Sequence, residues 1–282
     1  MGEAKLLEGK ILAAKIQDEI KQAVASLGQP RLISIQAGED RASDWYIGQQ
    51  EKMAAKLGIH FERAAASDQK DLLEKIRQAN SKYDGIFLAM PLPKNFDSDA
   101  ALLALDPRKD VEGIHPTSLG LIVLRKSKLI PPTAYAALQL IETAAKDSGK
   151  NLRGLKAVIA GQSAIVGRPL QLLLGERRVT TVVCNTGTSP ADLEKYISEA
   201  DIVVACAGQP GLVKGAWIKP GAIVIDVGTT EVHGKLTGDV EFEEAKKRAS
   251  YITPVPGGVG PLTVTMLMQN LMNAYRWQHR LS

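Results

Sequence analysis

The first stretch able to do chemistry is a glycine turn between a predicted strand and a predicted helix. The apolar residues 157–160 predict a buried parallel strand, and Pro169 with the leucines after it predicts a helix start. Gly161 and Gly167 flank the turn. Glycine lets a phosphate approach the backbone, and the free amides and positive dipole end of a helix attract it. The third glycine of the usual dinucleotide fingerprint is absent, so the turn alone fits either a phosphate site or an ordinary tight turn.

Composition limits the class of protein. The chain has 282 residues, enough for two domains with cores of their own. Its hydrophobic content of 45% and charged content of 23% are those of an ordinary soluble protein. The net charge of +4 is too small and too dispersed to predict nucleic-acid binding, and it mildly favours an anionic small molecule.

The remaining counts exclude several kinds of site. Cys184 and Cys206 lie in apolar, strand-like runs and are predicted to be buried core thiols. The four histidines lack metal-ligand spacing, so no metal site is expected. There is no apolar stretch of membrane-spanning length and no signal-peptide pattern at the N-terminus. We therefore expect a cytoplasmic protein without membrane contact.

Strand and helix patterns alternate along the first half of the chain. Helices are predicted at 11–27, 43–57, 71–80 and 133–145, and strands at 31–36, 59–64 and 85–90. Ser43 is the expected N-cap of the second helix. Residues 106–120 are rich in turn formers and are expected to be irregular. The alternation predicts a parallel α/β sheet, and the polar link after residue 146 predicts a domain boundary.

The second half repeats the alternation and predicts a dinucleotide-binding, Rossmann-type parallel sheet. Strands are expected at 157–160, 179–184, 202–207 and 222–227, with one of the intervening helices at 191–199. A glycine-proline loop at 251–260 is followed by an amphipathic helix at 262–275, which is predicted to return to the first domain. The expected fold is therefore two α/β domains around a cleft, 1–146 and 147–261, with the C-terminal helix 262–280 closing on the first.

Several single residues have structural interpretations. Gly208 and Gly228 end strands at the predicted carboxyl edge of the sheet, where ligands bind in such folds. Gly257 and Gly258 fit either a close approach of backbone to ligand or a tight turn. Asp226 is predicted to end a strand and order the adjacent loop, and Asp110 to cap a turn.

Blocks of sequence along the whole chain then become recognisable together. The first half contains Leu7-Glu8-Gly9-Lys10, Ala42-Ser43 with Tyr46, Gly85-Ile86 before Pro91-Leu92-Pro93, and Lys109-Asp110-Val111-Glu112-Gly113. The second half contains Gly161-Gln162-Ser163, Val166-Gly167-Arg168-Pro169, Ala200-Asp201-Ile202, Lys219-Pro220-Gly221-Ala222, Ile225-Asp226-Val227-Gly228, Gly238-Asp239-Val240 and Thr253-Pro254-Val255-Pro256-Gly257-Gly258-Val259-Gly260-Pro261. Over essentially its full length the chain resembles the bifunctional methylenetetrahydrofolate dehydrogenase/cyclohydrolase family.

The resemblance implies a fold, a substrate and two reactions. It implies an N-terminal folate domain and a C-terminal NAD(P) domain in a homodimer, with a tetrahydrofolate derivative as substrate. In the first reaction a hydride passes from the methylene bridge of the folate to the nicotinamide, and in the second the methenyl product is hydrolysed to a formyl derivative. The implied substrate contacts are Tyr46, Ala89, Glu112, Pro256, Gly257 and Gly258, with Tyr46 and Gln50 at the catalytic positions.

The chain departs from the family at three polar positions. The family has a catalytic lysine four residues after the stacking tyrosine, and here that position is Gln50. The glutamine that partners the lysine is replaced by Ala89, and the aspartate that holds the pterin is replaced by Glu112. The longer glutamate moves its carboxylate outward by roughly one C–C bond, of order 1 Å.

Chemistry indicates which reaction suffers. Hydride transfer needs positioning above all, whereas hydrolysis needs an activated water and proton transfers. Gln50 cannot titrate near neutral pH, and its neutrality removes repulsion toward the cationic methenyl product. Lys52 and Lys56 are poorly placed on the helix to substitute for it. The hypothesis is a dehydrogenase whose cyclohydrolase activity is lost or much weakened.

Two other functions stay open from the sequence. The first is an NAD(P)-linked oxidoreductase for a different imine or iminium substrate, because changes at a positioned site alter what fits it. The second is a non-catalytic paralogue. Retention of the cofactor turn and of residues 253–261 counts against the second.

The choice between NAD and NADP is also open. Many relatives carry a basic residue after the first glycine of the turn or after the second strand, to meet the 2′-phosphate of NADP. This chain has Gln162 and Asn185 at those places, so neither supplies bidentate phosphate pairing, and no acidic residue there prefers NAD. Arg168 is either a phosphate contact or a solvated residue, and Ser163 is the better candidate for a diphosphate or ribose contact. The predicted cofactor contacts are Gly161, Gln162, Ser163, Val166, Gly167, Arg168, Asn185, Thr186, Gly208 and Gly228.

Overall fold

The computed structural model describes residues 2–281, which form two compact units. Unit 1 comprises the described residues up to Ala13 together with Thr133–Thr263, and unit 2 comprises Ala14–Pro132 with the described residues from Val264 onward. The units change over after residue 132, and α6 (Pro132–Asp147) is bonded into unit 1 by Glu142 with Arg177 and by Asp147 with Tyr251. The predicted domain limits 1–146 and 147–261 remain a proposal.

Unit 2 is built on a three-stranded parallel sheet in the order β3-β2-β4. Its strands are β2 (Arg31–Ala37), β3 (His60–Ala66) and β4 (Gly85–Leu88), all at predicted places. The helices that supply residues to this unit are α1 (Gly9–Leu27), α2 (Arg41–Leu57), α3 (Gln69–Lys82), α4 (Ser98–Ala104), α5 (Pro116–Val123) and α10 (Val259–His279). Helices α1 and α10 begin in unit 1.

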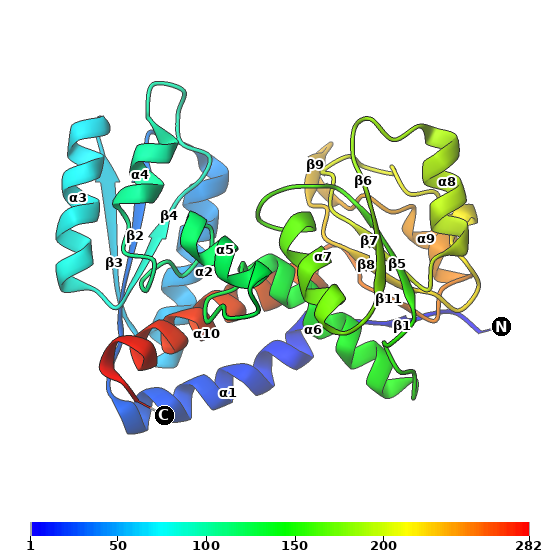
Figure 1. The fold of residues 1–282 in the computed structure, drawn as a ribbon, viewed down its shortest axis with the longest axis horizontal. Helices are drawn as coiled ribbons and strands as arrows, with labels where there is room; N and C mark the ends of the chain where they lie inside the picture. Colours follow the sequence, from blue (N-terminus) through cyan, green and yellow to red (C-terminus); the bar gives the residue numbers. More distant parts are fainter. Residues whose placement is uncertain (1, 282) are drawn as a thin grey trace. The chain divides into compact units, whose positions relative to one another are not determined.

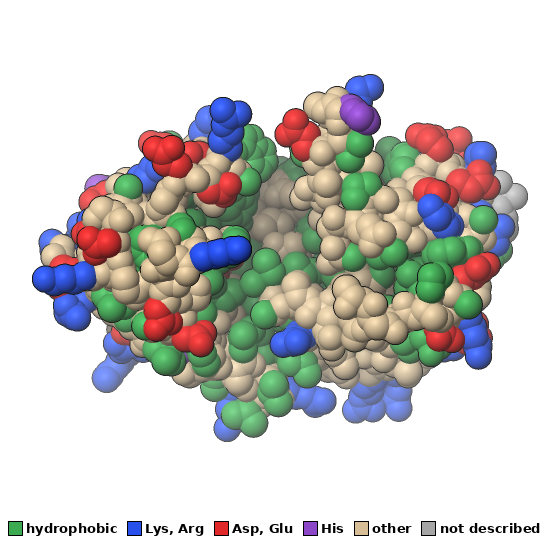
Figure 2. Space-filling view, turned by 90° about the horizontal axis from the view of Figure 1, so that it is seen from above, with side chains coloured by type: hydrophobic (Ala, Val, Ile, Leu, Met, Phe, Trp, Pro, Cys, Tyr) green, Lys and Arg blue, Asp and Glu red, His purple; other side chains and the backbone are tan. Residues whose placement is uncertain are grey.

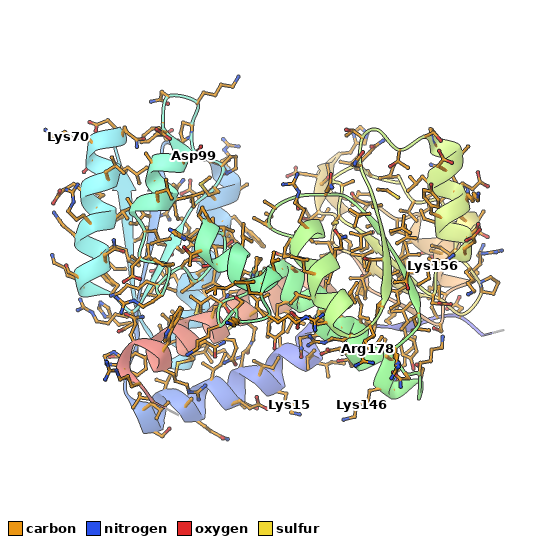
Figure 3. All side chains as sticks on the ribbon, viewed as in Figure 1. Lys15, Lys70, Asp99, Lys146, Lys156 and Arg178 are labelled. Atoms are coloured by element: carbon orange, nitrogen blue, oxygen red, sulfur yellow. The ribbon has the colours of Figure 1, made fainter. Side chains whose placement is uncertain are left out.

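Alternate residues of these strands face two different sets of helices. Leu32 and Phe87 lie in a core with side chains of α1, α2 and α10. Ile33 and Ile86, the neighbours of Leu32 and Phe87 in their strands, lie in a core with α3 and α4, which stand beside the sheet in Figure 1. Lys70 on α3 extends away from the ribbon (Figure 3). The sheet is therefore covered on both faces, as a parallel sheet requires.

Two expectations for unit 2 are wrong. The N-cap of α2 is Asp40, whose carboxylate accepts the Ser43 amide at 2.8 Å, so the helix starts earlier than a Ser43 cap would allow. Residues 106–120 are not wholly irregular, because α5 starts at Pro116 after His115, whose Nδ1 accepts the Thr117 amide at 3.0 Å. Proline fits the first turn of a helix because its missing N–H is not needed there.

Unit 1 contains a six-stranded parallel sheet in the order β1-β11-β8-β7-β5-β6. The strands are β1 (Lys5–Leu6), β5 (Lys156–Ala160), β6 (Thr180–Cys184), β7 (Ile202–Ala205), β8 (Ile223–Asp226) and β11 (Tyr251–Ile252). The remaining elements are α7 (Gly167–Glu176), α8 (Pro190–Glu199), the 3₁₀ turn η1 (Gly215–Trp217), α9 (Phe242–Lys246) and the hairpin of β9 (Thr230–Val232) and β10 (Lys235–Thr237). The two-residue strands β1 and β11 were not predicted.

The chain order of this sheet creates a switch point at β5. From β5 the chain goes to β6 on one side, and the next strand, β7, pairs with β5 on the other side. One face of the sheet, with Val158 and Val203, packs in a core with Leu193 of α8 and Ala245 of α9. A Rossmann-type sheet is thereby confirmed, and ligands of such sheets bind beyond the carboxyl ends of the strands at the switch point.

One face of the molecule shows how the charged side chains are distributed. On the face drawn in Figure 2, acidic and basic side chains are interspersed. Over residues 2–281, no helix has the length and apolar character needed to cross a membrane.

Candidate functional site

The turn after β5 is held by two glycines that no other residue can replace without movement. Gly161 has φ +133°, and a Cβ there would lie 2.4 Å from the Cys206 carbonyl oxygen. A Cβ on Gly167 would lie 2.0 Å from the Gly161 carbonyl oxygen. Contacts under 3.0 Å require the backbone to shift. The turn is therefore closed on itself by backbone packing, at the switch point of the sheet.

Ser163 closes the start of α7. Its Oγ accepts the Val166 amide at 3.1 Å, and its carbonyl oxygen accepts the Arg168 amide at 3.1 Å. Pro169 has no amide hydrogen. Among the described residues this leaves the Gly167 amide as the donor of the first turn without a recorded acceptor. The Ser163 hydroxyl still has its own hydrogen to donate, so its predicted role as a cofactor contact stays a prediction.

Gln162 and Asn185, which the sequence analysis considered separately, lie together. The Asn185 Nδ2 donates to the Gln162 Oε1 at 3.3 Å. The Asn185 Oδ1 accepts the Gly187 amide at 2.9 Å, and the backbone amide of Asn185 donates to the Thr188 Oγ1 at 3.1 Å. A pair of neutral amides therefore joins the turn after β5 to the residue that follows β6.

Asp226 orders the loops after β8, as predicted. Its Oδ1 accepts the amides of Gly228 at 2.9 Å and Asp239 at 3.0 Å, and its Oδ2 accepts the Val240 amide at 2.9 Å. Burial raises the pKa of Asp226 to about 6, against the lowering effect of these amides. Cys184 is buried and Cys206 partly buried, and both are free thiols.

The glycine-proline segment 253–261 has a tight turn of its own. Gly258 donates its amide to the Pro254 carbonyl at 2.8 Å, and a Cβ on Gly258 would lie 2.7 Å from that oxygen. The Gly257 carbonyl accepts the Gly9 amide at 3.1 Å, and the Val255–Pro256 peptide is cis. These contacts account for both glycines structurally, and their role toward substrate stays a prediction.

Gln50 of unit 2 has a buried side chain with one hydrogen bond. It is fully buried on α2, and its Oε1 accepts the hydroxyl of Ser34, a buried residue of β2, at 2.7 Å. Its Nε2 is buried and has no hydrogen-bond partner among the described residues. Ser34 thus fixes the orientation of the amide, and both hydrogens of its NH₂ group are left without an acceptor among the described residues.

Tyr46 and Glu112 lie close to each other. The rings of Tyr46 and Phe87 are 5.6 Å apart at a tilt of 56°. The pKa of Tyr46 is raised well above its usual range by burial and by the Glu112 carboxylate. Burial and the nearby Asp110 raise the pKa of Glu112 to about 8, and its Oε1 has no partner within residues 2–281. A buried carboxyl without a cation is favoured in its neutral form.

The other changed and flanking positions are built into the core. Ala89 is buried beside Phe87, and its amide donates to the Ile35 carbonyl at 2.9 Å. The Asp110 Oδ2 accepts the His115 amide and the Ser118 hydroxyl, both at 2.8 Å, which confirms a structural role for Asp110. A methyl group at position 89 supplies no hydrogen bond to any ligand.

Lys52 and Lys56, which are near Gln50 in the chain, and the buried Lys109 do not contact the Gln50 amide. Lys52 is exposed. The Lys56 Nζ donates to the Gln17 Oε1 at 2.6 Å, and the Lys109 Nζ donates to the Tyr83 carbonyl at 2.5 Å. No lysine of the described chain is therefore recorded at the amide of Gln50.

Two residues of these regions were missed by sequence reasoning. Ser34 is a polar residue inside an apolar strand pattern, and that interruption was an available signal. Asp239 lies in one of the family blocks without a predicted role, and its carboxylate accepts the Ala207 and Gly208 amides. That contact spans about thirty residues of chain, and no local pattern predicts it.

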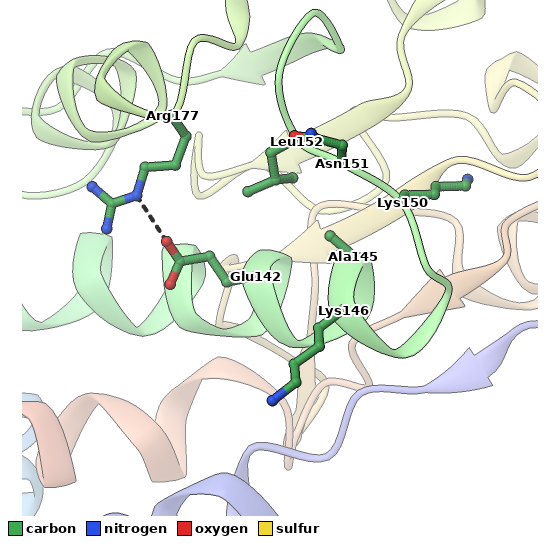
Figure 4. A pocket seen from close by; sticks show the side chains of 7 residues that line it. All are labelled: Glu142, Ala145, Lys146, Lys150, Asn151, Leu152 and Arg177. Carbon is green, nitrogen blue, oxygen red and sulfur yellow. Dashed lines mark hydrogen bonds and ion pairs between the residues drawn. The ribbon is translucent and has the colours of Figure 1, made fainter.

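A separate hollow lies in unit 1, at the C-terminal end of α6 (Figure 4). It is lined by Glu142, Ala145, Lys146, Lys150, Asn151, Leu152 and Arg177. Arg177 donates to Glu142 at 2.8 Å, and the Lys150 Nζ donates to the Gly221 carbonyl at 2.9 Å. No predicted site residue lines this hollow. Among residues 2–281, no group of three or more His, Cys, Asp or Glu side chains is arranged to hold a metal ion.

Comparison with known proteins covers both parts of the chain. Residues 7–112 match the family described as tetrahydrofolate dehydrogenase/cyclohydrolase, catalytic domain, and residues 131–279 match its NAD(P)-binding domain. The bifunctional protein FolD of Geotalea uraniireducens (strain Rf4) is 42% identical over 281 residues, covering 96% of this chain and 98% of that protein.

Solved structures give the same result. The N5,N10-methylenetetrahydrofolate dehydrogenase-cyclohydrolase (FolD) of Trypanosoma brucei, complexed with NADP cofactor and inhibitor, has a TM-score of 0.92 at 36% identity, covering 99% of this chain and 100% of that one. A 5,10-methylenetetrahydrofolate dehydrogenase from the silkworm, Bombyx mori, has a TM-score of 0.89 at 34% identity, covering 98% and 99%. The chain therefore belongs to the tetrahydrofolate dehydrogenase/cyclohydrolase family.

Proposed function

We propose that this chain is an NAD(P)-dependent 5,10-methylenetetrahydrofolate dehydrogenase whose cyclohydrolase activity is lost or much weakened. The observation that carries the proposal is Gln50. Its amide is fully buried, neutral and oriented by the Ser34 hydroxyl, at the position where the family has a catalytic lysine.

The residues fit a bound dinucleotide. The cradle formed at Gly161 and Gly167 has no room for a Cβ, and the Gly167 amide at the start of α7 has no recorded acceptor in the described chain. Such a turn holds a diphosphate through backbone amides. When bound, the nicotinamide supplies the hydride acceptor. We assign the holding of the dinucleotide to the turn residues 161–168, to Asn185 and Thr186, and to Gly208 and Gly228.

The dehydrogenase reaction requires little acid–base catalysis by protein side chains. Tyr46, packed against Phe87, presents an aromatic ring, and the raised pKa of its hydroxyl keeps that group neutral. Such a ring positions a flat substrate by stacking. Positioning alone can provide a large part of the rate of a transfer between two bound groups.

Hydrolysis requires a general acid–base group that accepts and then donates a proton. General acid–base catalysis contributes typically 10²–10⁴-fold, and a neutral amide cannot provide it. Lys56 and Lys109 are bonded to Gln17 and to the Tyr83 carbonyl, so neither replaces the missing cation in this conformation. We therefore expect hydrolysis to lose about this factor.

The test is a pair of initial rates on purified protein. Methylenetetrahydrofolate oxidation is measured with NAD and with NADP, and methenyltetrahydrofolate hydrolysis is measured beside it. Oxidation with hydrolysis near the uncatalysed rate supports the proposal. Hydrolysis as fast as oxidation contradicts the loss, and dinucleotide binding without oxidation contradicts the folate substrate.

Glu112 favours a second function, an oxidoreductase for a different imine or iminium substrate. Its side chain is longer than the family's aspartate and half-buried, its Oε1 is buried, and its pKa is raised to about 8, so near neutral pH it is largely protonated. A protonated carboxyl offers one donor, whereas a carboxylate only accepts. A ring with an acceptor opposite Glu112 would then be preferred, and a substrate screen for NAD(P)H formation distinguishes the two functions.

The homodimer and the cytoplasmic location are further parts of this proposal; the first rests on the family resemblance, and the second on the sequence patterns given above. Sedimentation of the purified chain tests the first, and cell fractionation tests the second.

A further inference from the structure

Asp239 is a fully buried carboxylate that holds a backbone segment far away in sequence. It lies in the loop that follows the β9–β10 hairpin and is 0% exposed. Its Oδ2 accepts the Ala207 amide at 2.7 Å and the Gly208 amide at 2.9 Å. These amides belong to the segment that leaves the carboxyl end of β7, so the carboxylate sets the direction in which that backbone turns.

Asp226 adds a second carboxylate in series with the first. It accepts the amide of Asp239 itself and that of Gly228, the residue that leaves the end of β8. The side chains of Asp226 and Asp239 together join the ends of β7 and β8 to residues 238–240. Both ends lie at the carboxyl edge of the sheet.

Two glycines show how tightly the carboxylates are packed. A Cβ on Gly228 would lie 2.3 Å from the Asp239 Oδ1, and a Cβ on Gly238 would lie 2.0 Å from the Asp226 Oδ2. Each carboxylate therefore rests on the Cα of a glycine and leaves no space for a side chain. The Asp239 Oδ1 itself is buried without a hydrogen-bond partner among residues 2–281.

Burying two carboxylates costs desolvation free energy. No lysine or arginine of the described chain is bonded to either carboxylate, and burial raises the pKa of both groups. A buried charge is costly unless it is compensated, and here backbone amides are the compensation. An ionised carboxylate accepts without donating, so it demands that every amide around it point inward. That demand fixes the local backbone more strictly than a neutral hydroxyl or amide would.

The segment held by Asp239 also contacts the turn after β5. The Cys206 amide donates to the Ala160 carbonyl at 2.8 Å, and the Cys206 carbonyl oxygen is the atom that a Cβ on Gly161 would meet at 2.4 Å. A shift of the 206–208 backbone would therefore change the packing of Gly161. The position of the phosphate turn depends on Asp239 through one connected set of contacts.

We propose that Asp239, supported by Asp226, is a positioning residue for the dinucleotide, holding the turns after β5, β7 and β8 in their binding conformation before the dinucleotide arrives. The inference rests on the proposed function in one respect, that the chain binds NAD or NADP. It assigns Asp239 no contact with substrate or cofactor.

The test compares Asp239→Asn with Asp201→Asn. Asparagine keeps the shape but removes the charge, and its NH₂ group has no acceptor in either orientation: it faces the Ala207 and Gly208 amides, or it is buried at the Oδ1 position, where no partner is recorded within residues 2–281. Asp201 is the control for the loss of a carboxylate that holds backbone, because it accepts the Lys156 amide at 2.9 Å near the amino end of the same sheet, although it differs from Asp239 in also pairing with Lys219 at 2.6 Å. The dissociation constants of NAD and NADP are measured by calorimetry on the protein without folate, together with the melting temperature.

We expect Asp239→Asn to weaken dinucleotide binding at least about tenfold and Asp201→Asn to change it less than about twofold, because displacements near 1 Å in a positioned site cost up to about a hundredfold. Equal binding in Asp239→Asn and the unaltered chain overturns the inference. An equal loss in both variants also overturns it, since the effect is then general to the sheet. Failure of the unaltered chain to bind either dinucleotide contradicts the proposed function, and the inference falls with it.

Hydrogen exchange keeps the inference testable if Asp239→Asn does not fold. In the unaltered chain without dinucleotide, the Ala207 and Gly208 amides are expected to be protected already, with little change when NADP is added. Free exchange of both amides, followed by protection on adding NADP, would show that the dinucleotide and not Asp239 orders the turn.

Discussion

The turn at Gly161 and the cluster around Gln50 are built from different parts of the chain. At the turn, the groups that define the site are backbone atoms and glycines, closed by contacts between Gly161, Gly167 and Cys206. Around Gln50, the groups are side chains, such as the Gln50 amide and the Ser34 hydroxyl bonded to it. A site made of backbone atoms is kept when side chains are substituted, so one activity of a two-step enzyme can be lost while cofactor binding is kept.

The buried carboxyls of the two units show the same contrast. Asp226 has amide donors on both oxygens and a pKa of about 6. Glu112 has a partnerless Oε1 and a pKa of about 8. Asp226 is therefore satisfied by the fold itself, whereas Glu112 needs a proton or a ligand. An unsatisfied polar group such as the Glu112 Oε1 is available to a ligand, whereas the oxygens of Asp226 are already engaged by backbone amides.

The largest expected effect comes from breaking the backbone-built site. Gly161→Ala places a Cβ 2.4 Å from the Cys206 carbonyl at a φ of +133° that side chains rarely adopt, so the turn must move. Dinucleotide affinity is expected to fall about a hundredfold or more, measured by calorimetry. Gly175→Ala is the control, because a Cβ there meets nothing within 4 Å and a helical alanine adds about 0.5–1 kcal/mol of stability. Unchanged affinity in Gly161→Ala would contradict a backbone-built site.

Restoring side-chain chemistry is the next largest change. Gln50→Lys with Ala89→Gln returns a titratable amine near the Ser34 hydroxyl and a polar group at position 89, so methenyl hydrolysis should rise by about tenfold or more. Gln49→Lys, about 100° around the same helix, is the control for added charge and should give no gain. Hydrolysis that stays at background in the double variant would sink the idea that these two positions disabled it.

The preference between NADP and NAD tests the role of Gln162, which is next to Gly161 in the turn. Gln162→Arg replaces one of the two paired amides with a group able to bind a phosphate through two hydrogen bonds. The ratio of NADP to NAD affinity is expected to rise about tenfold, an effect of the size of a charged hydrogen bond. Gln162→Leu removes the amide without adding charge and should leave the ratio near that of the unaltered chain. An unchanged ratio in Gln162→Arg would place the 2′-phosphate elsewhere.

The last expected effect is on stability and not on a rate or an affinity, and it is a pH slope from Glu112. Its pKa is about 8 in the folded chain against a reference value of 4.5, so between these values the folded state holds a proton that the unfolded state releases. The stabilisation is complete below pH 4.5 and is lost as the pH rises through 8, by at most about 1.4 kcal/mol per pH unit. Asp226 acts with the same sign up to about pH 6.

The measurement is urea unfolding between about pH 6.5 and 8.5, above most of the Asp226 window. Glu112→Gln should reduce the fall in unfolding free energy over this range relative to the unaltered chain. Parallel pH profiles for the two proteins would show that Glu112 is ionised throughout.

Sequence patterns predicted the elements whose apolar period is long. Residues 11–27 and 133–145 were placed within a few residues of α1 and α6, and β5 within one residue of its start. The two-residue strands β1 and β11 were missed because two residues carry no period. Helix α5 was missed because Pro116 and the surrounding glycines resemble a turn until His115 is known to cap it.

The site could be predicted as residue types but not as contacts. Resemblance identified Gln50, Ala89 and Glu112 as changed, whereas the Ser34 hydroxyl on Gln50 and the raised pKa of Glu112 follow from burial in three dimensions. In the same way, Gln162 and Asn185 were singled out separately, and their hydrogen bond depends on β5 and β6 being neighbours. Pairings between distant segments are tertiary information, and local periodicity does not contain them.

The most direct test of the account follows a single reaction mixture over time. The purified chain is given methylenetetrahydrofolate with NAD or NADP, and the methenyl and formyl products are quantified beside the reduced dinucleotide, with an enzyme-free methenyl sample as the control for spontaneous hydrolysis. The account predicts that the methenyl product accumulates in step with the reduced dinucleotide and decays at the rate of the control. Formyl product that keeps pace with the reduced dinucleotide would contradict it, because the site around Gln50 would then still hydrolyse.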